Sequence, residues 1–67
     1  MIPITVNGVP VELETSISVK EYLDSHSYTP TRIAVELNGA ILPKSDYSAT
    51  FLTEADTMEV VTFVGGG

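Results

Sequence analysis

The 67-residue sequence contains no cysteine and no tryptophan, and only three of its side chains are Lys or Arg. The absence of cysteine excludes disulfides, thiolate metal sites and cysteine nucleophiles, so packing alone must stabilise the fold. The sequence has nine acidic residues against these three basic ones, which gives a net charge of -6. Nucleic acid and anionic membranes are therefore not expected as partners, because both require clustered Lys and Arg. A protein with a basic surface is expected instead.

Long apolar runs are also missing from the sequence. No stretch approaches the roughly 20 residues of a membrane-spanning helix, and the start MIPITVNG lacks the basic segment and the apolar run of a secretory signal. We therefore expect a cytoplasmic protein that does not enter a membrane. A chain of 67 residues has room for one small core, so we expect one domain that is monomeric when free and has little space for a catalytic cleft.

Alternating hydrophobic residues predict four strands, two of them at the start of the chain. Asn7 and Gly8 separate the first two strands, and this dipeptide is typical of two-residue turns between antiparallel strands. Asn38 and Gly39 mark the end of the third strand. Residues 40–56 are irregular, which indicates a short strand followed by a turn of helix. The four strands are expected at residues 2–6, 9–13, 33–37 and 57–64.

The segment TSISVKEYLDSH predicts a short helix. Ser18 is followed three residues later by Glu21, which is the pattern of a capping box, so the helix is expected to start at Ser18. The residues expected to share its apolar face are Val19, Tyr22, Leu23 and His26. His26 is interpreted as a structural or solvated residue at the helix end, where the helix dipole favours it.

The order of these elements predicts an α+β fold, in which the first and last strands join one mixed sheet and the helix packs on one face. In the last strand, Met58 and Val60 should point toward the helix. Val61 and Phe63 should then lie on the opposite face, which no second helix is available to cover. We therefore predict that Val61 and Phe63 form a docking patch for a partner protein.

Neighbouring residues bear on this docking patch in two ways. Glu36 and Glu59 are expected on the same face, where they would speed encounter with a basic partner. In the alternative arrangement, the short elements around Tyr47 and Phe51 fold over this face and bury Phe63. The exposure of the Phe63 side chain distinguishes the two arrangements, since it is exposed in a docking patch and buried in the alternative.

Side chains suited to catalysis or metal binding are few. A Ser-His-Asp set would have to recruit His26, and without cysteine there is no Cys-His pair. The acidic pairs are scattered on predicted surfaces, so we interpret them as solvated or partner-steering charges and not as acid–base or cation sites. These pairs are Glu12 with Glu14, Glu21 with Asp24, and Glu54 with Asp56.

The chain ends in Val64, Gly65, Gly66 and Gly67. At neutral pH the carboxylate of Gly67 is ionised, because the reference pKa is about 3.5, and it can act as a nucleophile toward an activated phosphate. Four residues extend at most about 14 Å, and glycines fit a narrow tunnel because they have no Cβ. We therefore expect a folded domain at 1–63 and a flexible tail at 64–67 that delivers the carboxylate into another protein's active site. A frayed end or a cloning remnant is the alternative.

The second half of the chain contains Ala34 and Val35 before LNG, then Pro43, Asp56 and the ending FVGGG. With these features, the stretch from Ile33 to Gly67 resembles the ThiS family of sulfur carriers in thiazole biosynthesis, and the first half agrees with it in length and element order. Two positions depart from the family pattern: Tyr47 replaces an expected Trp, and Ala55 replaces the Gly that usually precedes the acidic residue.

The resemblance implies a ubiquitin-like β-grasp fold, with a mixed sheet of four to five strands and one main helix. It implies that an E1-like, ThiF-like enzyme uses ATP to adenylate Gly67, and that sulfur from a donor protein converts it to a thiocarboxylate. The thiocarboxylate then supplies a ThiG-like thiazole synthase, so the protein is a co-substrate that binds no cofactor and is not an enzyme. A carrier like the molybdopterin-synthase small subunit, or a ubiquitin-like modifier or interaction domain without sulfur chemistry, remains the alternative.

Overall fold

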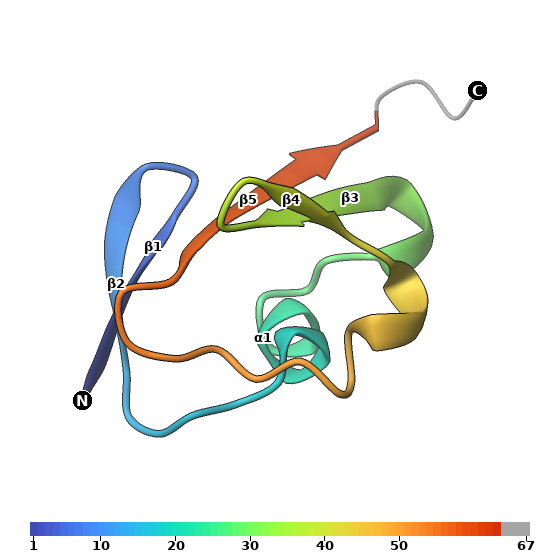
Figure 1. Cartoon of the computed structure of the whole chain (residues 1–67). Helices are drawn as coiled ribbons and strands as arrows, with labels where there is room; N and C mark the ends of the chain where they lie inside the picture. Colours follow the sequence, from blue (N-terminus) through green and yellow to red (C-terminus); the bar gives the residue numbers. More distant parts are fainter. Residues whose placement is uncertain (64–67) are drawn as a thin grey trace.

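The computed structural model describes residues 1–63 and contains five strands and one α-helix within that range (Figure 1). Residues 64–67, which were predicted to form the tail, lie outside the described residues. The elements are β1 (Ile2–Val6), β2 (Val9–Leu13), α1 (Val19–Ser25), the 3-10 turn η1 (Pro30–Arg32), β3 (Ile33–Leu37), β4 (Ala40–Leu42), the 3-10 turn η2 (Lys44–Asp46) and β5 (Thr57–Thr62).

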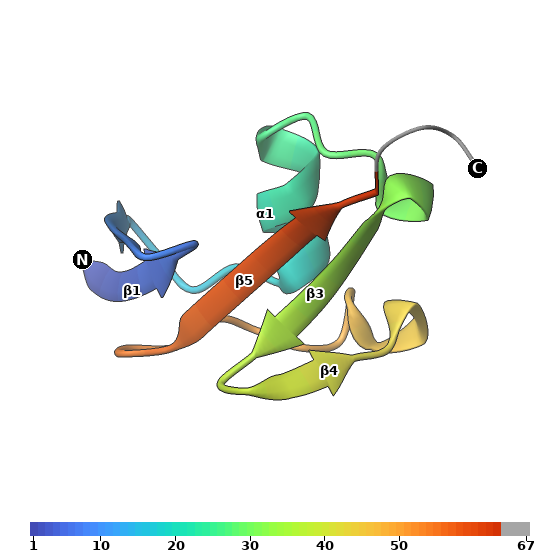
Figure 2. The same ribbon diagram turned by 90° about the horizontal axis from the view of Figure 1, so that it is seen from above.

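The strands form one mixed sheet in the order β2-β1-β5-β3-β4. β5 therefore lies in the centre, parallel to β1 and antiparallel to β3, and α1 packs against one face of the sheet (Figure 2). The last strand of the chain joins the first in one sheet, as the order of elements predicted. The predicted β-grasp arrangement is confirmed, and residues 40–56 contain the short strand and the turn of helix that were expected there.

Both Asn-Gly dipeptides form turns with positive φ at the two central positions. The φ angles are 51° at Asn7 and 79° at Gly8, and 53° at Asn38 and 86° at Gly39. This backbone geometry matches the twist of the strands on either side, and Asn and Gly tolerate it better than other residues. The first turn joins β1 to β2 and the second joins β3 to β4.

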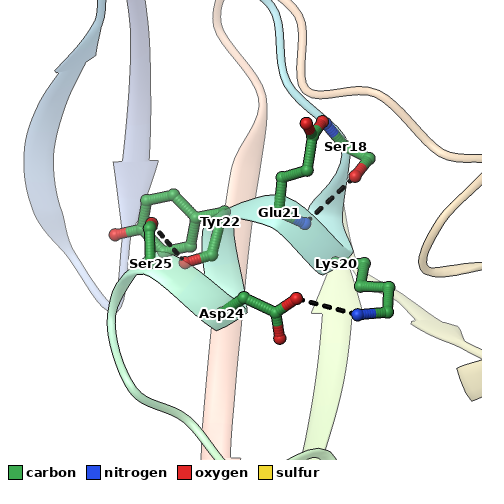
Figure 3. Close-up of polar contacts among 6 residues, drawn as sticks. All are labelled: Ser18, Lys20, Glu21, Tyr22, Asp24 and Ser25. Atoms are coloured by element: carbon green, nitrogen blue, oxygen red, sulfur yellow. Dashed lines mark hydrogen bonds and ion pairs between the residues drawn. The ribbon is translucent and has the colours of Figure 1, made fainter.

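The predicted capping box is present at the start of α1 (Figure 3). The main-chain N–H of Glu21 donates to the Ser18 hydroxyl at 3.0 Å, and the Glu21 carboxylate accepts from the Ser18 N–H at 2.9 Å. On the exposed side, Lys20 and Asp24 form an ion pair at 2.8 Å. The capping box satisfies the N–H groups of Ser18 and Glu21, while those of Val19 and Lys20 donate to main-chain carbonyls of residues 50 and 47 at 2.8 and 3.0 Å. A seven-residue helix is too short to be stable without such packing.

His26 does not belong to the apolar face of α1, and that expectation was wrong. The helix ends at Ser25, and His26 has left helical geometry with φ -106° and ψ 14°. Its side chain is exposed, and its ring stacks on Tyr22 with the centroids 4.0 Å apart. The spacing rule failed here because it holds only while the helix continues.

The core lies between α1 and the sheet, and the segment 44–53 runs beside α1 (Figure 1) and adds Tyr47 and Leu52 to the core. Leu52 is fully buried, and the main chain around it bonds to the segment before α1: the Leu52 N–H donates to Ile17 O and the Val19 N–H donates to Thr50 O, each at 2.8 Å. The largest fully buried side chains are Leu23, Ile33, Leu52, Met58, Val19 and Val35.

The two departures from the family pattern have different structural consequences. Tyr47, in place of the expected Trp, is buried with 4% of its surface exposed. Ala55, in place of the expected Gly, has a φ of 71°. Positive φ brings the alanine Cβ close to the following carbonyl oxygen, which glycine avoids. The Ala55 backbone is therefore strained in a way that a glycine would not be.

Candidate functional site

The two faces of β5 differ sharply in exposure. Met58 and Val60 point toward α1 and are 0% and 7% exposed, whereas Val61 and Phe63 on the other face are each 54% exposed. No helix of the described residues covers that outer face (Figure 2). Tyr47 is in the core and so does not fold over Phe63. The exposure that docking requires is therefore observed, while docking itself stays a prediction.

The pairing of β5 with β3 arranges the outer face in rows. Val61 lies opposite Ala34, and Glu59 lies opposite Glu36. At the end of the sheet, the Phe63 N–H donates to the carbonyl oxygen of Arg32 at 2.7 Å. Near the end of β5 the outer face is therefore predominantly apolar. It becomes acidic at Glu59, two residues before Val61 in β5, and at its partner Glu36 in β3.

Two asparagine side chains hold β5 from both sides. Asn7 accepts from the Val60 N–H at 2.8 Å and donates to the Val60 carbonyl at 3.3 Å. Asn38 accepts from the Thr57 N–H at 2.8 Å. From the sequence, both residues were predicted only to form turns. The sequence did offer a signal for these hydrogen bonds. Both turns contain Asn and not Asp, and an amide side chain can donate and accept hydrogen bonds at once.

Asn38 also connects β5 to the preceding turn. Its side-chain N–H donates to Asp56 at 2.9 Å, and Asp56 accepts from the main chain and the hydroxyl of Thr53 at 2.8 and 3.1 Å. Partial burial is the largest single influence and raises the pKa of Asp56, but these hydrogen bonds together outweigh it and hold the pKa below its ordinary value. Asp56 is thus an ionised anchor at the start of β5.

The other acidic pairs do not assemble into a site within residues 1–63. The carboxylate of Glu21 belongs to the capping box, and that of Asp24 is paired with Lys20. No group of three or more potential metal ligands lies together in this range. No helix within it has both the length and the apolar character needed to cross a bilayer.

The predicted reactive end lies outside the described residues: Val64, Gly65, Gly66 and Gly67. The structure describes the chain up to the residue before that segment, since β5 ends at Thr62 and the Phe63 N–H donates to the carbonyl oxygen of Arg32, the last residue of η1. The predicted docking residues Val61 and Phe63 therefore lie directly beside the point from which the chain continues to residue 64. The roles predicted for residues 64–67 stay predictions.

Comparison with known proteins supports the resemblance over the whole chain. A sequence model of the ThiS family matches residues 4–67. The crystal structure of the thiamine biosynthesis protein ThiS from Geobacter metallireducens superposes with a TM-score of 0.84 at 33% identity, over 98% of this chain and 100% of that one.

Two further relatives differ in length. The uncharacterized protein ycf40 of Pyropia yezoensis is 39% identical over 66 residues, which cover 98% of this chain and 93% of that protein. A thiazole synthase of Magnetococcus marinus is 38% identical over 64 residues, which cover 96% of this chain but only 20% of the synthase. With the family match and the shared fold, these findings show that the chain belongs to the ThiS family.

Proposed function

We propose that this chain is a sulfur carrier for thiamine thiazole biosynthesis. The observation that supports this most strongly is the likeness to the thiamine biosynthesis protein ThiS, with a TM-score of 0.84 at 33% identity and full coverage of that protein. The absence of cysteine adds a chemical reason. A carrier without a thiol must hold sulfur elsewhere, and the carboxylate of Gly67 is the group available to be converted to a thiocarboxylate.

The proposed chemistry needs two displacements at Gly67. A carboxylate oxygen attacks the α-phosphorus of ATP on an E1-like adenylating enzyme, and pyrophosphate leaves. Sulfur from a donor protein, at the oxidation level of sulfide, then attacks the acyl carbon, and AMP leaves. The chain supplies an ionised carboxylate, since the reference pKa is about 3.5, and the enzyme supplies the ATP site. This chain is therefore a co-substrate and not itself an enzyme.

A thiazole synthase is the proposed acceptor of the sulfur. Thiazole synthases of Magnetococcus marinus and Paramagnetospirillum magneticum each contain a segment similar to this chain, at 38% and 33% identity over 20% of their length. A carrier-like segment within the acceptor's own chain supports a direct functional relation between the two. We propose the same relation, between separate proteins, for this chain.

Docking by the outer face is proposed to bring the tail into the partner's active site. Val61 and Phe63 are exposed beside the point where residue 64 follows. An exposed aromatic side chain is the type that concentrates binding energy at interfaces. In this arrangement Gly65 and Gly66 pass through a narrow entrance, because they add no side chain to the thread.

Intact-mass analysis tests the proposal. The chain is incubated with ATP, an E1-like adenylating enzyme and a sulfur donor protein from the same organism, and a control reaction omits ATP. Exchange of one oxygen for sulfur, only with ATP, is the result expected for a carrier. Attachment of the chain to an amine of another protein would indicate a modifier, and an unchanged mass would indicate a binding domain. Either of these results would contradict the proposal.

A further inference from the structure

The side chains of the three basic residues make different contacts. Lys20 is paired with Asp24 at 2.8 Å, and the ammonium group of Lys44 donates to the Ile33 carbonyl at 2.9 Å. Arg32 is exposed, and its guanidinium makes no hydrogen bond or ion pair with residues 1–63. Its carbonyl oxygen accepts from the Phe63 N–H at 2.7 Å. Arg32 is therefore an exposed basic residue with no side-chain partner within residues 1–63, and its main chain lies beside Phe63, the residue before position 64.

A like-charged pair occupies the same face farther along. Glu36 and Glu59 are exposed and lie directly opposite each other in neighbouring strands. No cation of residues 1–63 forms an ion pair with either carboxylate. Like charges in this position destabilise a sheet, so folding gives no reason for the pair. We therefore relate the glutamate pair to the recognition of a partner protein.

Between these charges lie the apolar side chains of Ala34 and Val61, which face each other across β3 and β5. Arg32 is the last residue of η1 and bonds through its carbonyl to Phe63, so it borders the outer face at the end of the sheet. Ala34 with Val61 follow along this face, and then the two glutamates. This surface has a positive end, an apolar middle and a negative end. A partner surface can match that order in one direction only, because the reverse direction brings like charges together.

We propose that this charge order sets the direction in which the outer face docks on the adenylating enzyme. The proposal rests on the proposed function, since the partner is the enzyme that receives residues 64–67. The complementary surface carries an acidic group beside the entrance for the tail, an apolar pocket facing Val61 and Phe63, and a basic group farther from the entrance. Arg32 is thus a specificity-determining residue that orients the chain and does not participate in the chemistry.

Charge reversal tests the role of Arg32. Arg32→Glu is compared with Lys20→Glu, which changes the net charge equally but lies on the exposed side of α1, away from the outer face. Binding to the adenylating enzyme is measured by calorimetry at low and high salt, and thermal unfolding confirms that both variants fold. We expect Arg32→Glu to weaken binding about tenfold at low salt, with a smaller loss at high salt. Lys20→Glu should change binding less than about twofold.

Crosslinking tests the direction itself. Because the chain has no cysteine, single Thr31→Cys and Thr57→Cys variants can each carry a photoactivated crosslinker while Arg32 and both glutamates are retained. Thr31 precedes Arg32, and Thr57 begins β5 at the opposite end. The label at position 31 should capture an enzyme peptide that borders the nucleotide site, and the label at position 57 should capture one farther away.

Three results would overturn the proposal. Equal binding of Arg32→Glu and Lys20→Glu would show that only net charge matters, and a reversed order of captured peptides would show the opposite orientation. In both cases, normal adenylation of the unaltered chain would leave the proposed function intact. If the unaltered chain were neither bound nor adenylated by the enzyme, the proposed function would fail and this inference with it.

Discussion

The two faces of β5 are built from similar residues but have different environments. Met58 and Val60 are buried against α1, while Val61 and Phe63 leave 54% of their surfaces exposed. Burial explains the hydrophobic residues on the inner face, since each buried side chain contributes about 1.5–3 kcal/mol to folding. Burial does not explain the hydrophobic side chains of Val61 and Phe63, because about half of each remains exposed. The comparison teaches that the inner face of this strand stabilises the fold, whereas its outer face stays exposed and available for the docking proposed above.

Truncating the inner face should have the largest effect on stability. Met58 is fully buried, so Met58→Ala should lower the free energy of unfolding by about 2–5 kcal/mol, through lost burial and the cavity left behind. Denaturant unfolding monitored by circular dichroism measures this. Val61→Ala on the outer face is the matched control and should cost less than about 1 kcal/mol. Equal losses at both positions would remove the distinction between the faces.

Truncating the outer face should affect binding instead. Phe63→Ala should weaken binding to the adenylating enzyme by about 1–3 kcal/mol, because an exposed aromatic residue is a typical interface anchor. Its effect on unfolding should be smaller than that of Met58→Ala. Calorimetry and a denaturant melt on the same variant give both numbers. Unchanged binding together with a stability loss above about 3 kcal/mol would assign Phe63 to the core and contradict the docking patch.

Asp56 anchors the start of β5, and its role should appear as a pH dependence. Its pKa is lowered in the folded protein, so its stabilising contribution is present above the unfolded pKa of about 3.9 and is lost as pH falls through the folded pKa. Asp56→Asn should lower stability at pH 7 by about 1–2 kcal/mol and should weaken the loss of stability at acidic pH. Chemical denaturation from pH 7 down to pH 2 measures both.

The matched control for this variant is Glu54→Gln. Glu54 is an exposed carboxylate in the same turn, and no hydrogen bond to its side chain is found within residues 1–63. Its replacement should leave the pH profile nearly unchanged. A profile for Asp56→Asn identical to that of the unaltered chain would show that the hydrogen bonds from Asn38 and Thr53 do not stabilise the anchor.

Ala55 belongs to neither face, and changing it should give the smallest effect. Ala55→Gly should raise the free energy of unfolding by about 0.5–1 kcal/mol, because glycine relieves the strain of a φ of 71°. Ala49 does not have positive φ, so Ala49→Gly should lower stability by a similar amount. Thermal unfolding of both variants tests the pair. A loss of stability in Ala55→Gly would contradict the interpretation that the Ala55 backbone is strained.

Local patterns predicted most of the fold. Both turns, the capping box at Ser18 and the alternation in β5 depend on residues close in sequence, which is why they could be derived without the structure. The exposure of His26 was missed, because the apolar spacing in the sequence continues one residue beyond the end of α1 at Ser25. The side-chain bonds of Asn7 to Val60 and of Asn38 to Thr57 were also missed. They join residues far apart in sequence, so only the folded sheet shows them.

The candidate site was only partially predicted. The shared face of Val61 and Phe63 followed from alternation, and their exposure followed from having one helix for a two-sided sheet. The place of Arg32 beside Phe63 depends on the register between β3 and β5. Register is set by long-range pairing that one sequence does not reveal. The roles of residues 64–67 depend on chemistry with a partner and stay predictions.

The most direct test of the carrier role is deletion of Gly67. The deletion removes no side chain, and the buried core residues found within residues 1–63 lie between Ile4 and Val60, so thermal unfolding should match that of the unaltered chain. The terminal carboxylate would move back by about 3.5 Å, which is enough to misplace it for attack on ATP. Intact mass after incubation with ATP, adenylating enzyme and sulfur donor should then show no exchange of oxygen for sulfur. Thiocarboxylation of the shortened chain at the full rate would contradict the assignment of Gly67.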